Sequence, residues 1–233
     1  MKKLIVFATL ALCISLSTVV SAQIVNGSFE NGTEAALLDP GFFSASVGDI
    51  GSILAWEVSS GSVDYIGSYW QASEASRSID LNGFEKGSIS QTLTTTAGWT
   101  YTVTFAMSGN PDGVEDENNS YFSPAEKKMS VTAAAGPPQT YTYTTGANTL
   151  DIMAYETHTF SFTAIGASTD LVFTSEIEGA FGPVVDNVRI TEVTGQICHR
   201  DFGKPKVKTL TVGVAAIPAH VAHGDQQGPC QAQ

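Results

Sequence analysis

A loop between two predicted strands carries the side chains best suited to binding a ligand. The stretch reads GSVDYIGSYWQASEASRSIDLNG over residues 61–83, and it sets the rings of Tyr69 and Trp70 beside hydrogen-bonding groups. A sugar ring has a matching apolar face and polar rim, so carbohydrate is the first ligand indicated. The alternative is that both rings fold back over the end of the core. The predicted sugar-contacting residues are Asp64, Tyr65, Tyr69, Trp70, Arg77, Asp80 and Asn82.

Carboxylates near the two ends of the first 195 residues suggest a metal site. Val184, Val188 and Ile190 alternate onto one face of PVVDNVRI, and Asp186 falls on that same apolar face. A buried ionised carboxylate is costly unless it is paired or bound to a metal. Glu30, in FENG, would lie near Asp186 if the first and last strands are neighbours, and the two would hold a structural Ca²⁺. Alternatively, Asp186 accepts backbone N–H groups in a bulge and needs no ion.

The C-terminal 38 residues concentrate a second set of reactive side chains. Cys198, His199, His220, His223 and Cys230 lie within ICHRDFGKPKVKTLTVGVAAIPAHVAHGDQQGPC. His220 and His223 are three residues apart after a proline, which would place them on one face of a helical turn. In an exported chain the two cysteines favour a disulfide, worth roughly 3.5 kcal/mol on the chain-entropy estimate. The alternative is Zn²⁺ bound by cysteine and histidine.

The N-terminus has the pattern of a signal peptide. Lys2 and Lys3 precede an apolar run over residues 4–20 and a small-residue cleavage site, so we expect residues 1–22 to be removed. The remaining chain would carry 9 basic and 23 acidic residues. Such a charge repels nucleic acid and anionic membranes and favours neutral or cationic ligands. We expect a secreted, extracellular or cell-surface protein, with the periplasm as an alternative location.

Charge also divides the chain. Residues 23–195 hold 5 basic and 21 acidic residues, whereas residues 196–233 hold 4 and 2. The first part is long enough for one sizeable core, and the second is too short to fold without a covalent or metal link. No apolar stretch beyond the signal peptide is long enough to span a bilayer, so an integral membrane protein is not expected. We therefore predict one domain over 23–195 and a small Cys/His module over 196–233.

The larger part is predicted to be all-β. Short stretches with period-2 alternation are separated by clusters of Gly, Pro, Asn and Ser, which is typical of a β-sandwich. Ten or so antiparallel strands favour two packed sheets in a jelly roll. The predicted strands cover residues 24–30, 53–60, 62–66, 77–82, 87–95, 99–108, 127–134, 139–145, 157–165, 169–175 and 183–191.

Seven segments, in order, resemble one known family. NGSFE, AWEV, SGSVDYIGSYW, RSIDLNG, GSISQTL, YTVTFAMSGNPDG and FGPVVDNVRI are similar to the domain of unknown function 642 and its bacterial relatives, the choice-of-anchor C proteins. The resemblance implies a galactose-binding-like jelly roll, exported and associated with cell walls or extracellular polysaccharide. It also implies a structural calcium held by Glu30 and Asp186. The tail resembles small modules of unassigned role at the ends of other exported bacterial proteins.

Catalysis has little support in the sequence. There is no HExxH, G-x-S-x-G or nucleotide-binding loop, and the many acids make some glycosidase-like carboxylate pair inevitable. We therefore expect an exported, non-catalytic protein that binds a polysaccharide or cell-wall glycan. The alternatives are a structural or adhesion protein of an extracellular matrix, whose partner would be another surface protein, and a glycoside hydrolase.

Overall fold

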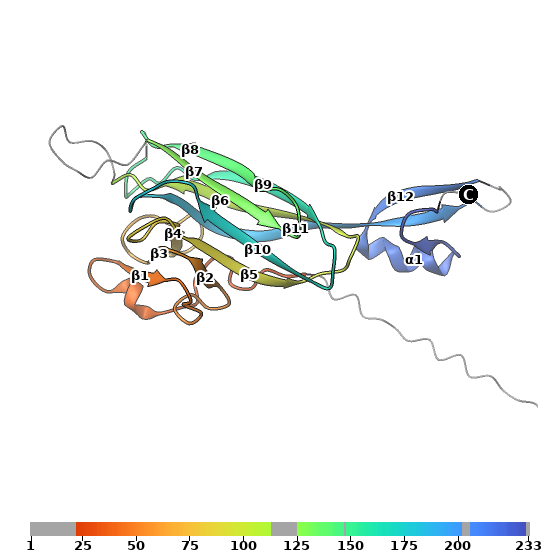
Figure 1. The fold of residues 1–233 in the computed structure, drawn as a ribbon, viewed down its shortest axis with the longest axis horizontal. Coiled ribbons are helices and arrows are strands. Elements are labelled where there is room, and N and C mark those ends of the chain that lie inside the picture. Colours follow the sequence, from red (N-terminus) through yellow and green to blue (C-terminus); the bar gives the residue numbers. More distant parts are fainter. Residues whose placement is uncertain (1–21, 113–124, 147, 202–205, 232–233) are drawn as a thin grey trace, which may run out of the picture.

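The chain folds into the predicted all-β jelly-roll sandwich (Figure 1). This computed structural model describes residues 22–112, 125–146, 148–201 and 206–231. The strands are β1 (Phe42–Ser46), β2 (Glu57–Ser60), β3 (Ser62–Ile66), β4 (Ser78–Asp80), β5 (Ser88–Thr94), β6 (Thr100–Gly109), β7 (Glu126–Ala133), β8 (Gln139–Thr144), β9 (Glu156–Thr163), β10 (Ser168–Ser175), β11 (Pro183–Arg200), β12 (Val207–Gly213) and β13 (Gln226–Gln227).

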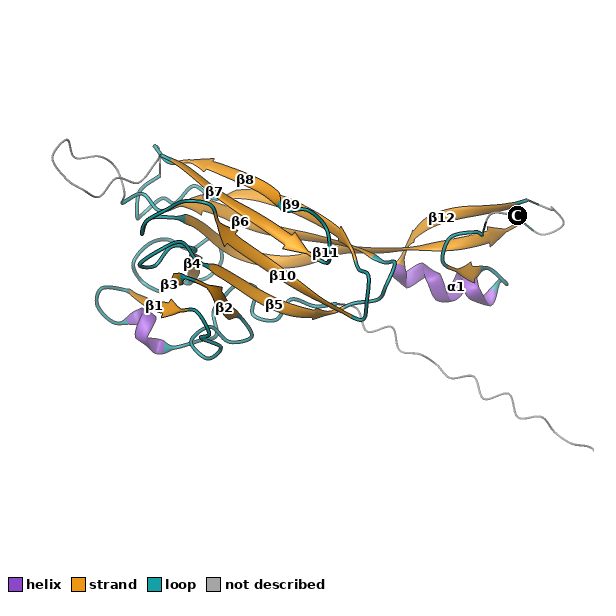
Figure 2. Ribbon diagram, viewed as in Figure 1, coloured by secondary structure: helices purple, strands orange, loops and turns teal. Residues whose placement is uncertain are grey.

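Helices are few and short in the described residues (Figure 2). They are the 3₁₀ helices η1 (Glu34–Leu37) and η2 (Val214–Ala216) and the α-helix α1 (Ile217–Ala222). Across the described ranges, no helix has the length and apolar character needed to cross a membrane.

The strands form two antiparallel sheets. The larger has the order β1-β3-β4-β11-β6-β9, with β12 and β13 added to the distal half of β11, and the smaller has the order β2-β5-β10-β7-β8. Since β3, β4 and β11 are neighbours, side chains distant in sequence share one face of the larger sheet.

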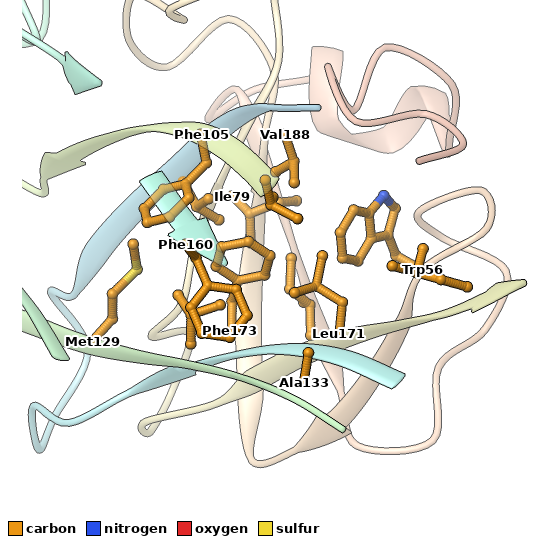
Figure 3. Packing of buried hydrophobic residues seen from close by; sticks show 14 of the residues in the cluster. Trp56, Ile79, Phe105, Met129, Ala133, Phe160, Leu171, Phe173 and Val188 are labelled. Carbon is orange, nitrogen blue, oxygen red and sulfur yellow. The ribbon is translucent and has the colours of Figure 1, made fainter. Parts of the chain in front are cut away.

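The core lies between the two sheets, where alternation predicts it. Tyr101, Val103 and Phe105 of β6 all point inward and are buried. Phe105 meets Phe173 of β10 edge to face, with ring centroids 5.2 Å apart (Figure 3). Truncating such a core ring to alanine costs about 3–5 kcal/mol, so this contact contributes strongly to the stability of the sandwich.

The N-terminal segment departs from the prediction. Residues 24–30 were predicted to form a strand, but the backbone turns at Asn26 and Phe29, whose φ angles are 53° and 58°. The turn drives Phe29 into the core, where its ring centroid lies 5.3 Å from that of Trp56. Strand β1 was not predicted at all.

A bulge in β11 corrects the predicted face of that strand. Asn187 has a φ of 53°, and the register with β6 shifts between Asp186 and Arg189. Val184 and Asp186 therefore lie on the outer face of the larger sheet, whereas Val188 packs in the core. The prediction that Val184 and Val188 share a face is wrong because the extra residue reverses the alternation.

The C-terminal module continues directly from the sandwich. Strand β11 runs across the boundary predicted between residues 195 and 196 and pairs there with β12 (Figure 1). Ile197 of β11 and Ile217 of α1 belong to the same buried cluster as Trp99 of the sandwich. The module is thus joined to the sandwich by a shared strand and a shared apolar contact.

Candidate functional site

Two loops cover the middle of the outer face of the larger sheet. Trp70, from the loop after β3, packs with Met153, from the loop before β9, over Ile66 and Val184 of the sheet. The two loops are tied together where the backbone N–H of Gln71 donates to the carbonyl of Leu150. This small second apolar cluster fixes the loop on which the predicted binding residues lie.

A pocket opens beside this covered region. Its volume is about 210 Å³, below the roughly 300–1,000 Å³ of sites for drug-sized molecules, so it suits a single ring. The lining residues come from β1, β3 and four loops: Phe42, Ser44, Asp64, Ile66, Tyr69, Trp70, Gly83, Phe84, Asn110, Asp112, Ala180 and Phe181.

Aromatic rings form much of the pocket wall. Tyr69 packs between Phe42 and Trp70, with ring centroids 5.3 and 5.6 Å away. Trp70 is only 5% exposed, and its Nε1–H donates to Ser78 Oγ at 2.9 Å. Phe84, by contrast, is 77% exposed. Phe84 is therefore the most exposed ring of the pocket, Tyr69 is partly exposed, and Trp70, also predicted to stack on sugar, is almost fully buried.

Two carboxylates supply the charged groups of the pocket. Asp64 accepts a hydrogen bond from Ser44 Oγ at 2.5 Å, and Asp112 accepts one from the Tyr69 hydroxyl at 2.5 Å. Burial raises the pKa of Asp64 to about 6, against the opposing effect of the Ser44 hydrogen bond. The bond to Asp112, with a smaller effect of burial, raises the pKa of Tyr69 to about 12. At neutral pH the pocket thus offers Asp64 as an ionised acceptor.

Tyr65 and Arg77, both predicted to contact sugar, do not line this pocket. Tyr65 points into the core, and its hydroxyl donates to the carbonyl of Phe29 at 2.6 Å. The Arg77 guanidinium donates to the Tyr65 hydroxyl and the Thr33 carbonyl, and pairs with Glu34 at 3.2 Å. Arg77 therefore ties the N-terminal segment to the sandwich.

Asp80 and Asn82, also predicted to contact sugar, are fully buried and do not line the pocket. Asp80 accepts the backbone N–H groups of Asn82 and Gly182 at 2.9 and 3.1 Å, and the amide of Asn110 at 2.8 Å. The side-chain amide of Asn82 donates to two backbone carbonyls. Burial holds the pKa of Asp80 well above its usual range, although the Asn110 hydrogen bond opposes the shift. Both side chains hold loops in place.

Glu30 and Asp186 both accept hydrogen bonds from the backbone of one loop. Glu30 accepts the backbone N–H groups of Ser76 and Arg77 at 2.9 and 2.8 Å. Asp186 accepts those of residues 73–74 at 2.8 and 2.9 Å, and burial raises its pKa to about 7. Backbone N–H groups thus bind these carboxylates, which is the alternative given for Asp186 from the sequence. A calcium ion at Glu30 and Asp186 stays a prediction.

The C-terminal module brings together part of its predicted metal set. Cys198 and Cys230 form a disulfide, which excludes them as thiolate zinc ligands. His199 and His220 lie together as predicted, but the third member of their group is Asp225 in place of His223. The prediction missed Asp225 because it considered only Cys and His as ligands.

Other pocket residues were missed for identifiable reasons. Phe42 and Ser44 lie on the unpredicted strand β1, and Phe181 precedes β11 in a loop with no pattern. Phe84 did carry a signal, since it is a lone aromatic residue in the polar turn NGFEK. A single exposed ring is common on protein surfaces, so this signal alone does not identify a binding residue.

Several solved structures resemble the fold remotely. TmCBM61, solved with β-1,4-galactotriose, is 15% identical, with a TM-score of 0.39 over 72% of this chain and 97% of its own. A family 16 carbohydrate-binding module is 14% identical, with a TM-score of 0.41 over 72% and 99%. A Stig cyclase from Fischerella sp. TAU is 20% identical, with a TM-score of 0.40 over 72% and 96%.

Sequence comparison gives one curated relative and one family. Halomucin from Haloquadratum walsbyi is 35% identical over an alignment of 214 residues that covers 86% of this chain. The chain spans only 2% of the length of halomucin. The family described as "Protein of unknown function (DUF642)" matches residues 22–191. Since this match covers well over half of the sequence, the chain belongs to the DUF642 family.

Proposed function

We propose that the chain is an exported, non-catalytic carbohydrate-binding protein and that the pocket at Asp64 and Phe84 holds one ring of a neutral or cationic polysaccharide. The observation that carries the proposal is the pocket itself, in which an exposed aromatic ring lies beside a partly buried carboxylate. Rings provide apolar stacking surface, and a carboxylate accepts hydrogen bonds from sugar hydroxyl groups.

The polar groups of the pocket favour hydroxyl-rich or cationic ligands over anionic ones. Asp64 and Asp112 both lie on its lining, and the whole chain carries a formal net charge of −12. Asn110 also borders the pocket, but its side-chain amide donates to Asp80 and its oxygen accepts the backbone N–H of Asp112. A uronic acid or sulfated sugar would meet repulsion here, whereas a neutral hexose or an amino sugar would not.

The experiment is retention of the chain on a panel of immobilised neutral, amino and acidic glycans. We expect binding to at least one neutral or amino glycan. Phe84→Ala should weaken it roughly 5–30-fold, because loss of a stacking ring costs about 1–2 kcal/mol. Asp64→Asn should weaken it roughly 10-fold or more, because hydrogen bonds to a charged group contribute about 1.5–3 kcal/mol.

Ile165→Ala is the matched control. Ile165 is 72% exposed, on the loop between β9 and β10, so its removal tests the loss of an exposed apolar side chain away from the pocket. Equal retention of the parent and Phe84→Ala, or no retention of the parent, would overturn the proposal. Capture of a purified surface protein without glycan retention would favour the adhesion alternative. Release of soluble sugar would favour the hydrolase.

A further inference from the structure

The C-terminal module gathers two imidazoles around one buried carboxylate. Asp225 Oδ2 lies 2.9 Å from His199 Nδ1 and 2.8 Å from His220 Nδ1. One ligand atom from each of these three residues lies within 4.8 Å of the other two. Two imidazole nitrogens and a carboxylate oxygen form a donor set that suits Zn²⁺, whereas Ca²⁺ and Mg²⁺ prefer oxygen alone.

The backbone brings these side chains together from three elements. Helix α1 ends at Ala222, and Gly224, two residues later, has a φ of 94° that is readily adopted only by glycine. This turn lets the backbone N–H of Asp225 donate to the carbonyl of His220. Strand β13 then pairs Gln226 with Cys198, which places Asp225 beside His199. The site is therefore specified by local turn chemistry and by strand register together.

Covalent and apolar contacts hold the site in shape. The Cys198–Cys230 disulfide fastens the C-terminal segment to β11 at the residue before His199. Ile217, which is 4% exposed, anchors α1 in the apolar cluster. The Asp225 side chain is 2% exposed, and its Oδ1 accepts the backbone N–H of Arg200 at 3.0 Å. The carboxylate is thus fixed, and Oδ2 is presented to both imidazoles.

Asp201 orients one of the imidazoles. Its Oδ1 lies 3.2 Å from His199 Nε2, the ring nitrogen that faces away from Asp225. If His199 Nε2–H donates to Asp201, then the Nδ1 lone pair points at the carboxylate of Asp225. Either a proton or a metal ion must then lie between Nδ1 and the carboxylate oxygen. A carboxylate on the distal nitrogen is the usual outer partner of a metal-binding histidine.

We propose that His199 Nδ1, His220 Nδ1 and Asp225 Oδ2 bind one Zn²⁺ ion, with Asp201 as the outer partner of His199. Tetrahedral coordination at zinc–ligand distances of roughly 2.0–2.1 Å requires neighbouring ligand atoms to be ~3.3 Å apart. The rings must therefore withdraw slightly from Asp225. The His199 and His220 side chains, 33% and 27% exposed, have room to do so.

The ion would connect β11, α1 and the turn before β13. This connection would be additional to the one that the disulfide makes. The partial exposure of both rings leaves one coordination position open to solvent. A water molecule or an oxygen ligand of a partner would fill that position. In the absence of metal, protons bridge the same atoms and the three side chains form a hydrogen-bonded group.

The test is zinc titration of the full chain, with its disulfide intact, against a chromophoric chelator. We expect one Zn²⁺ per chain, and roughly 100-fold or greater weakening in His220→Ala and Asp225→Asn. Asp201→Asn should weaken binding roughly 10-fold. His223→Ala is the matched control, because it removes an exposed histidine three residues from His220, and it should bind as the parent does.

Circular dichroism and the absence of free thiols would show that each variant keeps its fold and its disulfide. Visible absorption of the Co²⁺-loaded chain would report the coordination geometry independently of affinity. No zinc binding by the parent, or binding by Asp225→Asn equal to that of the parent, would overturn the proposal. Loss of zinc in His223→Ala alone would instead support the histidine set predicted from the sequence.

Discussion

The outer face of the larger sheet uses aspartate in two ways. In one region the carboxylate lines a pocket, and in the other the carboxylates hold loops in place. Asp64 of β3 opens onto the pocket and accepts a hydrogen bond from the hydroxyl of Ser44. Asp80 of β4 and Asp186 of β11 are 0% exposed, and each accepts backbone N–H groups from a covering loop. A carboxylate bound by backbone amides holds the chain in place, and one contacted only by a side-chain hydroxyl remains available to a ligand.

What covers each carboxylate explains the difference. Asp64 and Asp80 are paired in register on neighbouring strands, so both point to the same side of the sheet. Gly182 lies against Asp80, and a Cβ there would be only 2.6 Å from Asp80 Oδ1. The backbone of that glycine therefore covers Asp80. Asp64 instead lines the pocket, together with Phe42 and Phe84.

The largest expected effect is the loss of stability when a buried aspartate is removed. Asp80→Ala should lower the free energy of unfolding by about 3 kcal/mol, because the N–H groups of Asn82 and Gly182 and the Asn110 amide would remain buried without an acceptor. Chemical denaturation of parent and variant measures the change. Asp64→Ala is the matched control and should not lower the free energy of unfolding by more than about 1 kcal/mol. Similar losses in both variants would contradict the assigned roles.

Asp186 gives the next largest effect and separates hydrogen bonding from calcium binding. Asp186→Ala should lower the free energy of unfolding by about 2 kcal/mol, since residues 73–74 lose their acceptor but can partly rehydrate at the surface. Thermal unfolding with and without a chelator is the measurement. A difference between parent and variant that persists in chelator fits the hydrogen-bonded loop. If chelator lowers the parent Tm to that of the variant, the calcium predicted from the sequence is the cause.

The sequence predicts which side of a strand points into the core better than it predicts which residues are covered by loops. Alternation correctly gives the inward side of β6, because each residue there is decided by its nearest neighbours along the strand. The burial of Asp80 and the exposure of Phe84 depend on contacts between segments distant in the chain, for which no local pattern exists. The strand pattern and the family resemblance both predicted the sandwich, but neither could show which residues of the stretch 61–83 are buried.

The bulge at Asn187 is a second feature that the local sequence pattern does not predict. One residue with positive φ reverses the alternation of β11, so the face of Val188 could not be derived from periodicity. The Cys198–Cys230 disulfide was easier, because a pair of cysteines in the expected mature chain leaves a single intramolecular pairing.

The smallest expected effect is the pH dependence that Asp64 confers on stability and binding. Its pKa in the folded chain is about 6, against 3.8 as the ordinary value, so between these pH values only the folded chain keeps the proton. Raising the pH through this window lowers the free energy of unfolding. Asp80 and Asp186 act in the same direction, so Asp64→Asn should reduce the slope of Tm between pH 5 and pH 7, by roughly 2–4 °C over the interval, without abolishing it.

Glycan affinity should change in the opposite direction to stability as the pH rises over the same range. Ionised Asp64 accepts hydrogen bonds from sugar hydroxyl groups more strongly than the protonated acid, so glycan affinity should rise as the pH passes through about 6. The parent should thus bind more tightly while it becomes less stable, and in Asp64→Asn affinity should hardly vary with pH. Titration at several pH values, paired with thermal unfolding, measures both. Affinity that falls with rising pH in the parent would show that Asp64 acts as a proton donor to the ligand, and the two regions of the sheet face would then differ in protonation as well as in exposure.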